Sequence, residues 1–82
     1  MNGMTDMANG YSLLTIEEIR RADQRLLGVQ LGKICLRDNI PVTDVAEFFK
    51  VSRVTVYNWF KGKAVVSGKH VDRMQKLIQK LA

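Results

Sequence analysis

The 82-residue sequence predicts an all-α fold, a compact single domain of five helices. Apolar residues recur at intervals of three and four between Ile16 and Leu81, which is the period of helices with one buried side. Residues that begin or end helices, chiefly Ser, Thr, Gly and the single Pro, separate these segments. With 46% apolar and 26% charged residues, a chain of this length is expected to bury one modest core.

The N-terminal part is expected to hold a tail followed by an extra helix. Residues 1–11 show no periodicity and are predicted to form a flexible tail. Residues 12–25 are predicted to form the helix, opened by a capping box from Thr15 to Glu18. The sequence leaves open whether this helix continues into the next one across Gly28 or bends there.

Residues 26–82 are expected to form the core of the domain. Its first helix extends to about Asp38, and Pro41 follows the break because proline disfavours helix in the residue before it. Its last helix is predicted to be capped by Ser67 and to end near Leu81. The inner stripe of that last helix is predicted to be Val71, Met74, Leu77 or Ile78, and Leu81.

Between them, residues 43–61 are predicted to be two short helices joined by a tight turn. Thr43 can cap the first helix, and Asp44 lies in its first turn, where the helix dipole favours a negative charge. Ser52 can cap the second helix, and Val51 and Val56 have the spacing of a hydrophobic staple. The side chains expected to face inward are Val45, Phe48 and Phe49 in the first helix and Val56, Trp59 and Phe60 in the second.

The opposite side of the second helix carries polar side chains suited to a DNA groove. Arg can pair with guanine and Asn with adenine through two hydrogen bonds each, and an exposed Val can contact a thymine methyl group. The residues predicted to read bases are Arg53, Val54, Tyr57 and Asn58. The residues predicted to contact phosphates are Thr43, Ser52, Thr55, Lys61 and Lys63. The competing interpretation is an ordinary solvated helix face.

These residues resemble the lambda-repressor-like helix-turn-helix family, the phage repressor and Cro type. The matching positions in the helix pair are Ala46, Val51, Val56, Trp59 and Gly62. Those upstream are Leu27, Gly28, Leu31, Ile34 and Ile40, and those downstream are Val71, Met74 and Ile78. The resemblance covers about residues 26–82. It implies a compact helical domain that inserts residues 52–60 into the major groove of double-stranded DNA as a homodimer on a palindromic operator.

Three positions depart from the family pattern. Lys50 stands where the family usually has a Gly in a left-handed conformation, which costs a non-glycine residue about 1 to 2 kcal/mol. Val42 replaces the usual Gln, so one expected phosphate contact is missing. Phe60 replaces a commonly acidic residue, and an apolar ring there predicts extra packing against the N-terminal segment or a second subunit.

The charge distribution favours the same function independently of the family. Residues 50–82 carry eight basic side chains and one acidic one, a net charge of +7, whereas residues 1–49 have a net charge of −2. The positive half includes the predicted recognition helix, as expected for a protein that binds phosphates with salt-dependent affinity. RNA polymerase is a further partner that a regulator bound beside a promoter can touch.

Other classes of function find little support in the sequence. We expect no catalysis, because no nucleophile and base stand at a recognisable spacing. We expect no cofactor and no metal: Cys35 is predicted to be a small buried or half-buried residue and His70 a surface residue in the first turn of the last helix. We expect no membrane partner and a cytoplasmic, nucleoid-associated location in a bacterium or for a phage-encoded protein, because residues 1–10 lack the apolar core of a signal peptide.

Two alternatives remain open. The first is a homeodomain-like or recombinase DNA-binding module, because the segment from Val56 to Lys63 echoes the homeodomain recognition helix, although Gly62 stands where that family needs an Asn. The second is a protein-interaction module, such as an antitoxin or adaptor, that uses the N-terminal helix. The interaction-module alternative is disfavoured if this helix packs only on its own domain or on a second copy of the chain.

Overall fold

The computed structural model describes residues 11–82, and all the regular secondary structure in this part of the chain is α-helix. The predicted all-α class is therefore confirmed for the described residues. The helices are α1 (Leu13–Arg21), α2 (Leu27–Asp38), α3 (Val42–Phe49), α4 (Arg53–Phe60) and α5 (Gly68–Leu81). The predicted tail at residues 1–10 lies outside the described residues.

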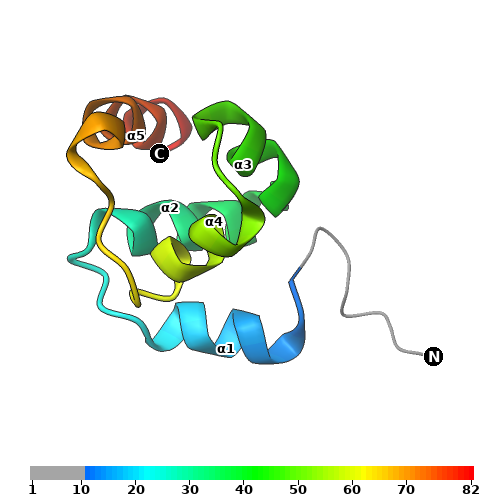
Figure 1. Ribbon diagram of the computed structural model, residues 1–82. Helices are drawn as coiled ribbons and strands as arrows, with labels where there is room; N and C mark the ends of the chain where they lie inside the picture. The colour runs from blue at the N-terminus through cyan, green and yellow to red at the C-terminus, as the bar shows by residue number, and fades with distance from the viewer. Residues whose placement is uncertain (1–10) are drawn as a thin grey trace.

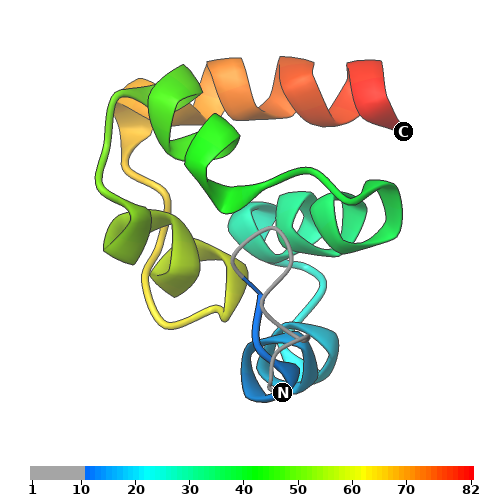
Figure 2. The ribbon, with the colours of Figure 1, turned by 90° about the vertical axis from the view of Figure 1, so that its right-hand side faces the viewer.

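Helix α2 occupies the middle of the molecule and packs against α1, α4 and α5, while α3 packs against α4. Figure 1 shows α5 at one end of the domain and α1 at the opposite end, and the turned view in Figure 2 agrees. Helix α4, the candidate recognition helix, therefore packs against both α2 and α3. This arrangement leaves one long side of α4 at the surface.

The core around α4 is aromatic. Phe49 and Trp59 meet edge to face with ring centroids 5.5 Å apart, and His70 packs against both rings. Phe60 is fully buried and stacks on Tyr11 with centroids 6.5 Å apart. The inner faces of α3, α4 and α5 thus form one apolar cluster, which also includes Tyr11.

Two glycines allow α2 and α4 to approach closely. A Cβ atom built on Gly28 would lie 2.7 Å from the carbonyl oxygen of Trp59, and one built on Gly32 would lie 2.8 Å from Cγ of Phe60. Real side chains do not tolerate such contacts, so glycine is required at both positions for this helix spacing.

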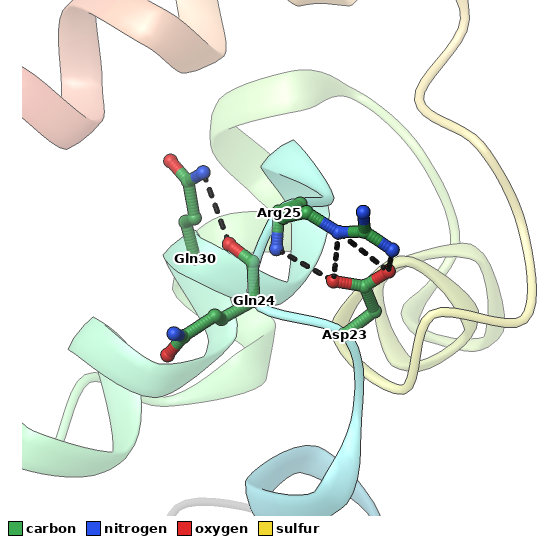
Figure 3. Close-up of polar contacts among 4 residues, drawn as sticks. All are labelled: Asp23, Gln24, Arg25 and Gln30. Atoms are coloured by element: carbon green, nitrogen blue, oxygen red, sulfur yellow. Dashed lines mark hydrogen bonds and ion pairs between the residues drawn. The ribbon is translucent and has the colours of Figure 1, made fainter.

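A short connection sets the angle between α1 and α2 (Figure 3). The Asp23 carboxylate accepts hydrogen bonds from the backbone N–H of Arg25 and from its guanidinium group, at 2.8 to 3.2 Å. The Gln30 side chain donates to the carbonyl oxygen of Gln24 at 3.1 Å. The chain therefore ends one helix at Arg21 and begins the next at Leu27, which answers the question left open at Gly28.

The start of the N-terminal helix differs from the prediction. Ser12 caps α1 by accepting a hydrogen bond from the backbone N–H of Thr15, so the capping box predicted from Thr15 is wrong. The helix also ends at Arg21 rather than near residue 25. Tyr11, assigned to the tail, is only 4% exposed and donates a hydrogen bond to the carbonyl oxygen of Ile40 at 2.9 Å. Tyr11 is therefore part of the packed domain.

Three further predictions about single residues are wrong. Thr43 does not cap α3, because the helix already begins at Val42 with Pro41 at the cap position. Phe48 is 42% exposed rather than turned inward, and the Arg73 guanidinium lies 4.6 Å from its ring centroid. His70 is buried rather than at the surface, because α5 presents its first turn to the aromatic core.

Several local predictions are confirmed. Ser52 caps α4. Lys50 adopts the left-handed conformation with φ of 59°. Phe60 packs against the N-terminal segment, and Cys35 is fully buried. Ser67 stands at the cap position of α5, although its side chain makes no capping hydrogen bond. Among residues 11–82, no helix is long and apolar enough to cross a membrane.

Candidate nucleic-acid interface

A tight turn fixes the angle between α3 and α4. Lys50 ends α3 in the left-handed conformation, and the backbone N–H of Val51 bonds back to the carbonyl oxygen of Ala46 at 3.0 Å. Ser52 then begins α4 by accepting from the backbone N–H of Thr55 at 3.1 Å. Both ends of the turn are therefore satisfied by hydrogen bonds, and α4 has a defined orientation on the core.

The predicted base-reading residues do not all lie on the outer side of α4, because Tyr57 packs partly against the core. Arg53 is exposed, and Val54 is 66% exposed even though it is apolar. Tyr57 and Asn58 are half-buried one turn further along the helix. Their opposite neighbours Val56, Trp59 and Phe60 are buried, so the predicted division of α4 into an inner and an outer side is present.

The hydroxyl residues among the predicted phosphate contacts lie near the start of each helix. Thr43 is exposed in the first turn of α3, beside Asp44, which adds a negative charge at that end. Ser52 and Thr55 share a hydrogen bond of 3.0 Å between their side-chain oxygens at the start of α4. The N-terminus of α4 therefore carries two hydroxyls and Arg53 with no acidic residue in its first turn, which favours an anion there.

Lys61 and Lys63, the two lysines predicted to contact phosphates, follow the C-terminal end of α4 and form ion pairs within the protein. Glu18 of α1 binds Lys61 at 3.1 Å and Lys63 at 3.3 Å. The Lys61 side chain is 20% exposed, and its ammonium group also lies 5.7 Å from the centroid of the Tyr57 ring. The structure thus brings both lysines together, but with an acidic partner that the sequence analysis did not anticipate.

The backbone after α4 holds these lysines in place. The carbonyl oxygen of Asn58 accepts hydrogen bonds from the backbone N–H groups of Lys63, at 2.9 Å, and Ala64, at 3.2 Å. Gly62 allows this turn because it has φ of 75°, and a Cβ added there would lie 3.3 Å from side-chain atoms of Leu26 and Val29. The positions of Lys61 and Lys63 therefore follow from the same chain segment that ends the candidate recognition helix.

The other reactive groups of the described chain are structural. Burial raises the pKa of the Cys35 thiol to about 12, so the thiol is protonated and unreactive at neutral pH. Among residues 11–82, no group of three or more potential metal ligands comes together. His70, the single histidine, is packed between Phe49 and Trp59 rather than directed at solvent.

Sequence reasoning missed Glu18 as part of this surface. It treated Glu18 as a capping residue, because nothing local connects a side chain on the first helix with the end of the fourth. The one available signal was Phe60, whose apolar ring predicted packing against either the N-terminal segment or a second subunit, and the ring stacks on Tyr11.

No protein-family model, no curated protein and no solved structure matches the chain.

Proposed function

We propose that this protein is a sequence-specific, double-stranded DNA-binding transcriptional regulator with a lambda-repressor-like helix-turn-helix fold. The observation that carries the proposal is the outer side of α4: Arg53, Val54 and the half-buried Asn58 stand on a helix whose other side is buried in the core. Such a rigid helix with an exposed polar side suits the major groove. The positive charge of residues 50–82 supports the same function.

In the proposed mechanism, residues 52–60 enter the major groove. Arg53 and Asn58 read base edges, Val54 contacts a thymine methyl group, and Tyr57 contacts either a base or the backbone. Ser52, Thr55 and the lysines after α4 set the register on the phosphates. A homodimer on a palindromic site would act by occupancy, blocking RNA polymerase or touching it from an adjacent site.

The packing of α1 bears on the adaptor alternative. Ile19 is fully buried, and Glu18 binds the end of α4, so the inner side of α1 is used by its own domain. Among the apolar side chains of that helix, Leu13 and Leu14 are exposed, at 68% and 70%. The proposal therefore treats α1 as part of the DNA-binding domain.

Substitution of Arg53 tests the proposal. Arg53→Ala should cost about 1 to 3 kcal/mol at the preferred site and relax the preference at one base pair, because a bidentate base contact is lost. Arg53→Lys keeps the charge but not the paired hydrogen bonds and should also relax that preference. Asn58→Ala should do the same at another base pair.

The matched control is Arg21→Ala, which removes the same charge from an exposed position on α1. Sites are first selected from a pool of random duplexes, and affinities are then measured for the selected site and its single-base variants. Enrichment of a palindrome would support both specificity and two-fold assembly. If Arg53→Ala and Arg21→Ala weaken binding to all duplexes equally, base reading by Arg53 is wrong, and a pool without enrichment would favour the adaptor.

A further inference from the structure

A single carboxylate joins the N-terminal helix to the end of α4. Oε1 of Glu18 lies 3.1 Å from Nζ of Lys61, and Oε2 lies 3.3 Å from Nζ of Lys63. Each oxygen thus has its own ammonium partner. The Glu18 and Lys61 side chains are 31% and 20% exposed, and Lys63 is 60% exposed, so the cluster lies at the edge of the core and remains accessible from solvent.

The three residues of this cluster are held by backbone that is anchored elsewhere. Lys61 directly follows α4, and Lys63 is fixed by the turn that bonds to Asn58. Glu18 precedes Ile19, which is fully buried. The fold therefore places the backbones of Lys61 and Lys63 so that both ammonium groups can reach the Glu18 carboxylate.

The contact between the Glu18 carboxylate and the two ammonium groups resembles a contact between lysines and a DNA phosphate. A DNA phosphodiester carries two non-bridging oxygens on one atom, and a carboxylate likewise presents two oxygens from one atom. Lysine ammonium groups bind either anion as point charges. A pair of lysines that binds both oxygens of a carboxylate, one ammonium to each, is thus suited to bind a phosphodiester in the same way.

We propose that Lys61 and Lys63 form a phosphodiester-binding site and that Glu18 occupies it as an internal competitor, so that α1 sets the affinity for DNA backbone. This inference rests on the proposed function and adds a regulatory element to it. A phosphate must displace Glu18 on any DNA sequence, so the competitor weakens sequence-independent binding. The cost is the same at the preferred site and elsewhere, so Glu18 lowers the affinity for every DNA sequence and leaves the preference for one sequence to the base contacts.

Glu17 supplies a matched control on the same helix. It pairs with Arg21 one turn later at 3.0 Å, and this pair is well exposed. Glu17→Gln and Glu18→Gln both neutralise one carboxylate of α1 and differ only in whether that carboxylate faces the lysines. Circular dichroism and thermal unfolding would establish that both variants are folded.

The first experiment measures binding of a random-sequence duplex as a function of salt. Glu18→Gln should bind about 3 to 10 times more tightly than wild type at the same salt concentration, because its lysines are free before the DNA arrives. Its log–log salt dependence should stay close to that of wild type, because both proteins bind the same phosphates once Glu18 has been displaced. Glu17→Gln should change affinity by less than about twofold, because separated surface charges are screened at 0.1 M salt. Equal effects of the two substitutions, or weaker binding by Glu18→Gln, would overturn the proposal.

A second experiment uses the wild-type chain and does not depend on any variant folding. The two lysines lower the pKa of Glu18, first through their hydrogen bonds to the carboxylate. When duplex DNA takes the lysines, the pKa of Glu18 followed by carbon NMR should rise, because its cationic partners are lost and phosphates approach. A pKa of Glu18 that stays lowered in the DNA complex would contradict displacement.

Inorganic polyphosphate separates this inference from the proposed function. It presents the same pairs of phosphate oxygens but no base edges. If no DNA sequence is preferred and Glu18→Gln still binds polyphosphate more tightly than Glu17→Gln, the internal competitor stands and sequence-specific regulation fails. If both variants bind polyphosphate like wild type, the competitor is wrong whatever the DNA result.

Discussion

Gly28 shows how a single residue determines the distance between two helices. Its missing side chain lets the carbonyl oxygen and Cβ of Trp59 approach to within 2.7 and 2.8 Å of where a Cβ would stand. Backbone cannot move aside as a flexible side chain can. We therefore expect Gly28→Ala to destabilise the fold by about 1 to 3 kcal/mol, despite the higher helix propensity of alanine, because the contact overpacks the core.

Gly68 provides the control for this prediction. It opens α5, and a Cβ there would meet nothing within 4 Å. Gly68→Ala should leave stability unchanged or raise it by up to about 1 kcal/mol, because the unfolded chain loses freedom. Urea unfolding of both variants measures the difference. Equal stabilities would mean that α2 and α4 can move apart without loss.

Which residues could be predicted from sequence depends on the range of their contacts. The left-handed conformation of Lys50 is what the family resemblance implies, and the burial of Trp59 and Phe60 follows from the period of their own helix. His70 and Phe48 could not be placed in this way. Their exposure depends on how α5 crosses α3, where Arg73 covers one face of Phe48 and donates to its carbonyl oxygen at 3.0 Å.

At the scale of helices, three serines stand at cap positions, and Ser12 and Ser52 accept a capping hydrogen bond whereas Ser67 does not. The Ser52 hydroxyl accepts from the backbone N–H of Thr55, whereas the Ser67 hydroxyl makes no such bond. We expect Ser52→Ala to cost about 1 kcal/mol of unfolding free energy, because an N–H group at the start of α4 loses its partner. Ser67→Ala should change stability by less than about 0.5 kcal/mol.

Thermal or urea unfolding of the two serine variants checks this prediction. Amide hydrogen exchange adds a local measurement, since exchange in the first turn of α4 should accelerate in Ser52→Ala. A Ser67 variant that is as unstable as the Ser52 variant would mean that the difference in capping geometry has no energetic weight.

The caps also show the limit of reading helix starts from sequence. Ser12 and Thr15 both belong to residue types that cap helices, and Thr15 had the better pattern because Glu18 follows it. The structure uses Ser12, which starts α1 one turn earlier and frees Glu18 to reach the lysines after α4. Local pattern therefore predicted that a helix exists here, but its boundaries depend on packing over the whole domain.

At the scale of the whole molecule, α1 is the least predictable part because all its important contacts are distant in sequence. Ile19 packs in the shared core, Glu18 joins the end of α4, and Tyr11 bonds to the turn after α2. The helix pair and its outer surface could be predicted from spacing alone. The attachment of the N-terminal segment could only be suspected from Phe60, whose place on α4 called for an apolar partner.

This attachment predicts how stability of the whole chain changes at alkaline pH. Burial raises the pKa of the Tyr11 phenol above its ordinary value of 10.0 and that of Cys35 from 9.0 to about 12. The folded protein therefore retains protons that the unfolded chain releases. Stability is unaffected below about pH 9 and falls as the pH rises further, by up to about 1.4 kcal/mol per pH unit for each group.

Tyr11→Phe measures how much of the loss of stability at alkaline pH comes from the Tyr11 phenol. It keeps the ring on Phe60 but loses the hydrogen bond to Ile40, so at pH 7 it should be about 1 kcal/mol less stable than wild type. Above pH 10 it cannot ionise at this position, and its stability should fall less steeply than that of wild type. Urea unfolding between pH 7 and 11 measures both curves. Parallel curves would show that Tyr11 ionises as easily in the folded protein as in the unfolded chain, and that the N-terminal segment is not closed over the core as the structure describes.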